Sequence, residues 1–76
     1  MQEVIIGKEG TQKFPINNSR VSRQHAKITV SDSGQWTLED LNSTNGTLVN
    51  NRRITRCPLR NGDLLTFGLS TFEFRG

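Results

Sequence analysis

Apolar and polar residues alternate along most of this chain, and a period of two is the pattern of half-buried β-strands. In residues 25–30, for example, His25 and Lys27 fall on the polar face, and the residues beside them fall on the apolar face. No stretch has the period of an amphipathic helix, so we expect an all-β fold. The segments predicted as strands are 3–7, 13–16, 25–30, 36–40, 47–50, 64–68 and 71–75, and 53–54 and 57–59 are short fragments between them.

Glycine and asparagine separate these segments at short intervals. The pairs that accept the positive φ of tight turns are Asn45-Gly46, Asn50-Asn51 and Asn61-Gly62, and Gly68 begins the turn of a predicted terminal hairpin. Many short strands at roughly 8–12-residue spacing, joined by such turns, are typical of an all-β sandwich or barrel. In these folds the loops cluster at the ends, where binding residues are usually placed.

The length of 76 residues allows one domain, which we place at 1–76, either complete or as a fragment of a longer protein. Cys57 is the single cysteine and His25 the single histidine, so we expect no disulfide, no metal site and no cofactor. No apolar run approaches the roughly 20 residues of a membrane span, and no signal peptide follows Met1.

The net charge of +3 is a mild bias toward anionic partners. It is too small for a nucleic-acid signature, and Trp36 and the phenylalanines fall at core positions and do not form a stacking surface. The basic residues gather in two clusters, one of Lys8, Lys13, Arg20, Arg23 and Lys27, and one of Arg52, Arg53, Arg56 and Arg60. We interpret the second cluster as a solvated face or an auxiliary peptide contact.

The segment "SRVSRQH", residues 19–25, combines hydroxyl, guanidinium and imidazole groups in one short loop. The guanidinium groups of Arg20 and Arg23 suit phosphate or carboxylate, and Ser22 offers a hydroxyl. Val21 is the lone apolar residue, and we expect it to anchor the loop. We expect His25 to brace the loop by hydrogen bonds.

The segment "DLNSTNGT", residues 40–47, fits two interpretations equally well. Asn45-Gly46 is either the tip of a hairpin or part of a recognition loop whose amides bind a peptide backbone. A phosphate monoester carries about −1.5 to −2 charges and needs several converging donors. An ammonium, a guanidinium and two hydroxyls meet that need if the fold brings three loops together, namely those of Lys8, Arg23, Ser22 and Thr44.

These positions together closely resemble the forkhead-associated (FHA) domain, from about Ile5 to Gly68. FHA domains are β-sandwiches of short, mostly antiparallel strands that bind phosphothreonine peptides through loops at one end. The resemblance implies a non-catalytic signalling module that binds a phosphothreonine-containing protein marked by an upstream Ser/Thr kinase. The need for kinase-modified partners suggests the cytoplasm or a cytosol-facing domain of a longer protein. It rests on Gly7, Ser22-Arg23-x-His25, Asp40, Ser43-x-Asn45-Gly46-Thr47, Asn50 and Gly62-Asp63, in the family's order and spacing.

The resemblance also implies a role for each site residue. Ser22 and Arg23 hold the phosphate, and Thr44 adds a hydrogen bond to it. Asn45 pairs with the peptide backbone beside the phosphothreonine. Arg20 matches a position that reads the side chain three residues after the phosphothreonine, and as an arginine it favours an acidic residue there. The supporting positions are Gly7, His25 and Gly46.

The chain departs from the family pattern at three points. Lys8 stands where arginine is usual, which keeps the charge but loses the bidentate guanidinium. Asn51 stands where glycine is common, and asparagine tolerates left-handed geometry. The chain also begins near the family's third strand, and the absence of the usual first pair leaves an edge and apolar surface uncovered. A homodimer or strand exchange is therefore a further hypothesis.

Two other functions compete with phosphopeptide binding. A phosphate-independent interaction or assembly domain on the same fold is favoured by Lys8 alone. A hydrolase would use Ser22 as the nucleophile and His25 as its base. No nucleophile elbow and no clear third orienting group accompany that pair, so we expect no enzyme activity.

Overall fold

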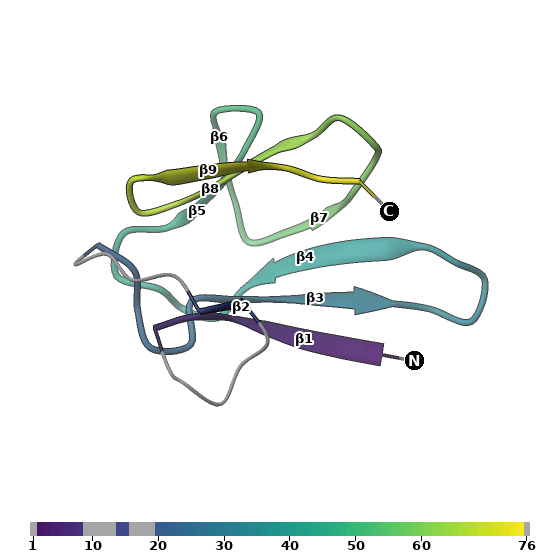
Figure 1. Ribbon diagram of the computed structural model, residues 1–76, viewed down its shortest axis with the longest axis horizontal. Coiled ribbons are helices and arrows are strands. Elements are labelled where there is room, and N and C mark those ends of the chain that lie inside the picture. The colour runs from purple at the N-terminus through teal and green to yellow at the C-terminus, as the bar shows by residue number, and fades with distance from the viewer. Residues whose placement is uncertain (1, 9–13, 16–19, 76) are drawn as a thin grey trace.

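The computed structural model describes residues 2–8, 14–15 and 20–75, and these residues form nine β-strands and no helix (Figure 1). Each strand begins and ends within two residues of a predicted segment. Lys13, Ser19 and the outer residues of the predicted segment 13–16 lie outside the described residues. The strands are β1 (Gln2–Gly7), β2 (Phe14–Pro15), β3 (Ala26–Val30), β4 (Trp36–Asp40), β5 (Thr47–Val49), β6 (Arg52–Ile54), β7 (Arg56–Pro58), β8 (Leu64–Phe67) and β9 (Ser70–Glu73).

The strands form two stacked sheets, so the fold is the predicted β-sandwich (Figure 1). The five-stranded sheet has the order β2-β1-β3-β4-β7, and the four-stranded sheet has the order β6-β5-β8-β9. The β1–β2 pair is parallel, whereas the other pairs in both sheets are antiparallel. The prediction of mostly antiparallel strands is therefore confirmed.

A small apolar core fills the space between the sheets. Leu38 on β4 and Phe67 on β8 are 0% and 1% exposed, and they come from opposite sheets. At the rim, the rings of Trp36 and Phe74 meet edge to face with centroids 5.6 Å apart. Trp36 therefore packs against the core, at the position that the alternation predicts. The buried apolar residues are Ile6, Val21, Ala26, Leu38, Val49, Leu59, Leu65 and Phe67.

The asparagine and glycine pairs have different tasks. Asn50 and Asn51 have φ values of 51° and 68° and form the two-residue turn between β5 and β6, as a type I′ hairpin requires. Gly68, with a φ of 62°, and Leu69 form the turn between β8 and β9. Asn45-Gly46 is not a hairpin tip, because residues 41–46 lead from β4 in one sheet to β5 in the other.

His25 differs from the position that the alternation predicts for it. The pattern places it on the polar face of a strand, but the residue precedes β3 and is fully buried. Its backbone N–H donates to the carbonyl oxygen of Ile6 at 2.8 Å. Its ring packs edge to face against Phe67 at 5.7 Å, so the imidazole lies inside the sandwich.

The loops that carry the predicted site residues lie at one end of the sandwich (Figure 1). The end of β1, the segment 20–25, the crossover 41–46 and the β8–β9 turn all lie at the left of the view, whereas the β3–β4 hairpin lies at the right. The predicted gathering of loops at one end is therefore present. Within the described ranges, no helix is long and apolar enough to cross a membrane.

Candidate functional site

Gly7 allows the end of β1 to lie directly against the segment 20–25. A Cβ atom on this residue would lie 2.7 Å from the carbonyl oxygen of Ser22 and would overlap the carbonyl oxygen of Arg23. The Lys8 N–H donates to the same Ser22 carbonyl at 3.2 Å. Because glycine has no side chain, this approach brings the Lys8 ammonium beside the serine loop.

The buried imidazole of His25 joins the two site loops. Its Nδ1 accepts a hydrogen bond from the Ser22 backbone N–H at 3.1 Å, and its Nε2 donates to the Gly46 carbonyl oxygen at 2.7 Å. Two bonds of opposite sense fix the neutral tautomer with its hydrogen on Nε2. Both ring nitrogens are therefore occupied by main-chain groups, and the ring holds Ser22 and Gly46 at a fixed separation.

The Asp40 side chain holds the crossover loop, residues 41–46, through hydrogen bonds. Its carboxylate accepts hydrogen bonds from the Ser43 hydroxyl at 2.5 Å, the Thr47 hydroxyl at 2.7 Å and the Ser43 N–H at 3.2 Å. The Ser43 hydroxyl oxygen in turn accepts from the Gly46 N–H at 3.0 Å. Burial raises the pKa of Asp40, but the hydrogen bonds from Ser43 and Thr47 outweigh it and lower the pKa below its ordinary value of 3.8. A chain of hydrogen bonds thus runs from the carboxylate through Ser43, Gly46 and His25 to Ser22.

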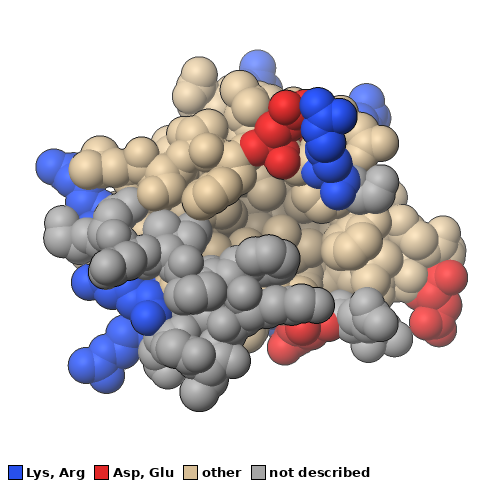
Figure 2. Space-filling model, in the orientation of Figure 1, with Lys and Arg blue, Asp and Glu red and all other residues tan. Residues whose placement is uncertain are grey.

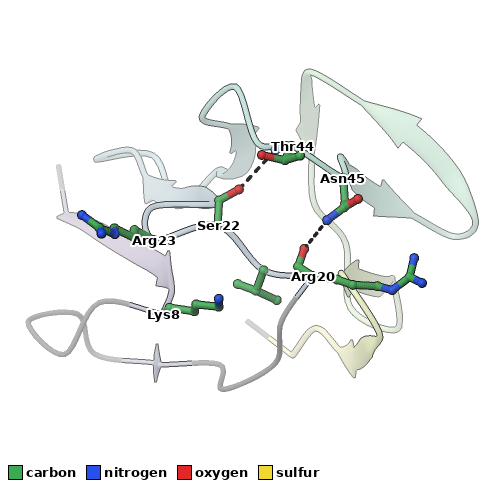
Figure 3. A pocket seen from close by; sticks show the side chains of 7 residues that line it. Lys8, Arg20, Ser22, Arg23, Thr44 and Asn45 are labelled. Atoms are coloured by element: carbon green, nitrogen blue, oxygen red, sulfur yellow. Dashed lines mark hydrogen bonds between the residues drawn. The ribbon is translucent and has the colours of Figure 1, made fainter.

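Two further hydrogen bonds tie the crossover loop to the serine loop at the surface. The Thr44 N–H donates to the Ser22 hydroxyl oxygen at 3.2 Å, and the Asn45 side-chain amide donates to the Arg20 carbonyl oxygen at 2.8 Å (Figure 3). The Ser22 hydroxyl keeps its own hydrogen for another acceptor. The Asn45 amide keeps one N–H and its oxygen, which is the set that pairs with a peptide backbone.

All six residues predicted to bind the peptide line one open pocket of about 410 Å³. They come from three segments that are far apart in the sequence, and the buried Val21 forms part of the floor. In Figure 3 the Lys8 ammonium points into the pocket, whereas the guanidinium groups of Arg23 and Arg20 point outward on opposite sides. The lining residues are Lys8, Arg20, Val21, Ser22, Arg23, Thr44 and Asn45.

The electrostatics of this end favour an anion. Three of the seven lining residues are cations, and none of the seven is acidic. On the face shown in Figure 2, the left end carries blue Lys and Arg side chains and no red carboxylate, whereas the top and the right show both colours. Polar donors beside several cations are the chemistry that suits an anionic group.

The geometry does not support a hydrolytic pair. The Ser22 hydroxyl accepts from Thr44, and His25 bonds main-chain groups with both of its nitrogens. A nucleophile needs a base within hydrogen-bond reach of its own oxygen, and the buried imidazole is already committed elsewhere. Among the described residues, no cluster of three His, Cys, Asp or Glu side chains is placed to hold a metal ion.

Comparison with known proteins decides the family. Residues 4–68 match the FHA domain family. The chain belongs to that family. A solved structure from a structural and functional analysis of phosphothreonine-dependent FHA domain interactions superimposes on this FHA domain with a TM-score of 0.86 and 38% identity, over 91% of this chain and 71% of the other.

Two curated relatives place the FHA domain in longer proteins. The FHA domain-containing protein FhaA of Mycobacterium tuberculosis is 41% identical over 71 residues, which is 93% of this chain and 13% of FhaA. The E3 ubiquitin-protein ligase DMA2 of Saccharomyces cerevisiae is 36% identical over 80 residues, which is 93% of this chain and 15% of the ligase. This FHA domain therefore spans about a seventh of the length of these relatives.

Sequence reasoning identified the residues that line the pocket but missed part of the framework beneath it. It named Asp40 and Thr47 only as motif positions, although their side chains are hydrogen-bonded to each other under the crossover. A carboxylate followed at three and seven residues by hydroxyl side chains was the available signal. It also placed Arg53 only within a second basic cluster, although the arginine lies against Gly46.

We expect the stability of this FHA domain to fall in acid partly through Asp40. Its folded pKa is lowered, so the stability that it contributes is complete above the ordinary value of 3.8 and is lost as the pH falls through the folded pKa. At neutral pH, Asp40→Asn should lower the free energy of unfolding by roughly 1.5–3 kcal/mol. The variant should also lose less stability than the wild type as the pH falls into the acid range.

Denaturant unfolding across this pH range is the measurement, and Asp63→Asn is the matched control. Asp63 also has a lowered pKa, chiefly through the Arg60 N–H and the Asn50 side chain, but it lies outside the site network. Asp40→Asn with the acid profile of the wild type would contradict the role assigned to this carboxylate.

Proposed function

We propose that this FHA domain is a non-catalytic module that binds phosphothreonine-containing proteins. The observation that carries the proposal is the pocket in which Lys8, Ser22, Arg23 and Thr44 converge from three loops. The solved relative from work on phosphothreonine-dependent FHA interactions, at 38% identity, supports the same function. The hydrogen-bonded framework supports it further, because such a site is organised before the ligand arrives.

The donors of the pocket match the chemistry of a phosphate monoester. The Ser22 hydroxyl is held by the Thr44 N–H below it, so its hydrogen is available to a phosphate oxygen. The Lys8 ammonium already points into the pocket. Arg23 is exposed and adds its guanidinium by rotation of the side chain, with no change in the backbone. Together these groups supply the charge and the donors that a doubly charged group with three acceptor oxygens requires.

Asn45 extends recognition from the phosphate to the peptide. Its bond to the Arg20 carbonyl fixes the amide at the rim of the pocket. The remaining amide groups pair with the backbone next to the phosphothreonine, and Arg20 reads an acidic side chain farther along. A bare phosphate ion cannot use these contacts, so the proposal requires a peptide ligand.

The proposed partners follow from this ligand. A phosphothreonine exists only after a Ser/Thr kinase has acted, so the domain works downstream of such a kinase, in the cytoplasm or on a part of a longer protein that faces the cytosol. Neither a nucleic acid nor a membrane is part of the proposal. The curated relatives are much longer than this chain, and the proposed function concerns the FHA domain alone.

The decisive experiment is a fluorescence titration with a degenerate phosphothreonine peptide library. We expect micromolar binding that Ser22→Ala weakens by roughly tenfold or more, because a charge-assisted hydrogen bond contributes about 1.5–3 kcal/mol. Unphosphorylated peptides and peptides with Asp in place of the phosphothreonine should bind much more weakly. Ser33→Ala is the matched control, because this exposed serine lies in the β3–β4 turn at the other end of the sandwich.

The controls separate the candidate functions. Equal affinity for Asp-substituted and phosphorylated peptides would contradict the proposed mechanism. Failure of a folded sample to bind any version would instead favour a phosphate-independent assembly domain on the same fold.

Lys8 provides a test of the geometry. If its ammonium reaches the phosphate, Lys8→Arg should strengthen binding several-fold, because a guanidinium can form two parallel bonds where lysine forms one. The ratio of the two dissociation constants, measured with one phosphopeptide, is the readout. An unchanged ratio would show that the side chain at this position does not contact the phosphate.

A second copy of the chain is a further proposed partner. β9 is the last strand of the four-stranded sheet, and Phe72 is 47% exposed although it lies opposite Leu65, which is 4% exposed. We expect light scattering to show a mass that rises with concentration above 8.6 kDa, and Phe72→Glu to prevent the rise. Leu69→Glu is the control, because this side chain is 73% exposed in the β8–β9 turn. A constant monomer mass at high concentration would contradict self-association.

A further inference from the structure

Arg53 lies against the crossover loop immediately behind the pocket rim. A Cβ atom placed on Gly46 would lie 2.7 Å from its Nε, 3.0 Å from its Cζ and 3.2 Å from its Cδ. Gly46 therefore leaves room for the guanidinium end of Arg53 to lie on the backbone. Both main-chain polar groups of Gly46 are hydrogen-bonded. Its N–H donates to the Ser43 hydroxyl oxygen, and its carbonyl oxygen accepts from the His25 ring. The arginine thus rests on one of the most constrained residues of the site.

The position of Arg53 on β6 explains its exposure. It pairs with Leu48 across β5 and β6, whereas its neighbours Arg52 and Ile54 pair with Val49 and Thr47, which are buried. Successive side chains in a strand point to opposite faces, so Arg53 lies on the outer face of the four-stranded sheet. The side chain is exposed, and within the described part of the chain no carboxylate forms an ion pair with it.

Asn45 is hydrogen-bonded to one arginine, and its neighbour Gly46 contacts a second. On one side its amide donates to the carbonyl of Arg20, and on the other side the next residue, Gly46, carries the guanidinium of Arg53. A peptide whose backbone pairs with Asn45 would therefore lie close to the main chain on which Arg53 packs.

We infer that Arg53 is a specificity residue, which binds an acidic side chain of the phosphopeptide on the side of the phosphothreonine that Asn45 holds. This inference rests on the proposed function and deepens it, because it assigns to the second basic cluster a contact separate from that of Arg20. The guanidinium is already packed against Gly46, so little side-chain freedom is lost when it binds a carboxylate. Its planar donors suit that group in a bidentate geometry.

The test is a positional scan with single substitutions in a phosphothreonine peptide whose flanking residues are all alanine. Glu replaces one flanking alanine at a time, and the affinity of each peptide is divided by that of the all-alanine peptide. We expect at least one position on the Asn45 side at which Glu improves wild-type binding by about threefold, the scale of an exposed ion pair. Arg53→Gln should abolish this gain and leave binding of the all-alanine peptide unchanged.

Two control variants isolate the contact. Arg52→Gln removes the same charge from the adjacent residue on the opposite face, so it should keep the full gain. Arg53→Lys keeps the charge without the bidentate group and should keep part of it. Thermal unfolding of each variant confirms that the fold is intact, and added salt should reduce the gain in the wild type.

The outcomes distinguish this inference from the proposed function. Binding of the all-alanine phosphopeptide with no Glu position sensitive to Arg53→Gln would overturn the inference and leave the proposed function standing. An equal loss in Arg52→Gln would also overturn it, because the effect would then be one of net charge. No binding to any phosphopeptide would overturn both. A gain lost only in Arg53→Gln would establish the contact and its position on the peptide.

Discussion

The buried imidazole of His25 is the interaction on which the binding end of this sandwich depends. It accepts from the Ser22 N–H and donates to the Gly46 carbonyl, so it links a loop of one sheet to the crossover that leads into the other. A fully buried histidine is costly unless both ring nitrogens have partners, and here each has a main-chain one. The same bonds that satisfy the ring also fix the distance between the loops. His25 therefore contributes both to the stability of the fold and to the geometry of the site.

The framework around that imidazole separates two tasks. Asp40, Ser43 and Gly46 hold the crossover from below, and Gly7 lets the end of β1 approach from the side. The cations at the pocket are exposed, and they supply charge, whereas the Ser22 hydroxyl also ties the serine loop to the crossover. A buried polar network that is fully hydrogen-bonded is rigid, whereas exposed long side chains are adaptable. The proposed phosphate contacts combine both, with the Ser22 hydroxyl fixed by Thr44 and the arginines able to rotate toward the ligand.

Much of this arrangement follows from local sequence physics. The alternation of apolar and polar residues predicted longer strands such as β3 and β4, because a half-buried strand must repeat every two residues. Asn50 and Asn51 predicted the hairpin that they form, because few residues accept two successive positive φ values. The prediction that His25 lies on a polar face was wrong because the residue precedes β3. Outside the strand, the period of two no longer determines which way a side chain points.

By itself, the sequence determined the all-β class, the strands and turns, and, through the family resemblance, the six residues of the pocket. Only the tertiary structure decided that Asn45-Gly46 belongs to a crossover and not to a hairpin, that His25 is buried between the loops, and that Arg53 rests on Gly46. The physical reason is the distance along the chain over which each kind of interaction acts. Periodicity and turn chemistry depend on neighbours along the chain, whereas these contacts depend on which sheet each strand joins. The stacking of the two sheets determines these contacts, and it brings residues that are far apart in the sequence together around one pocket.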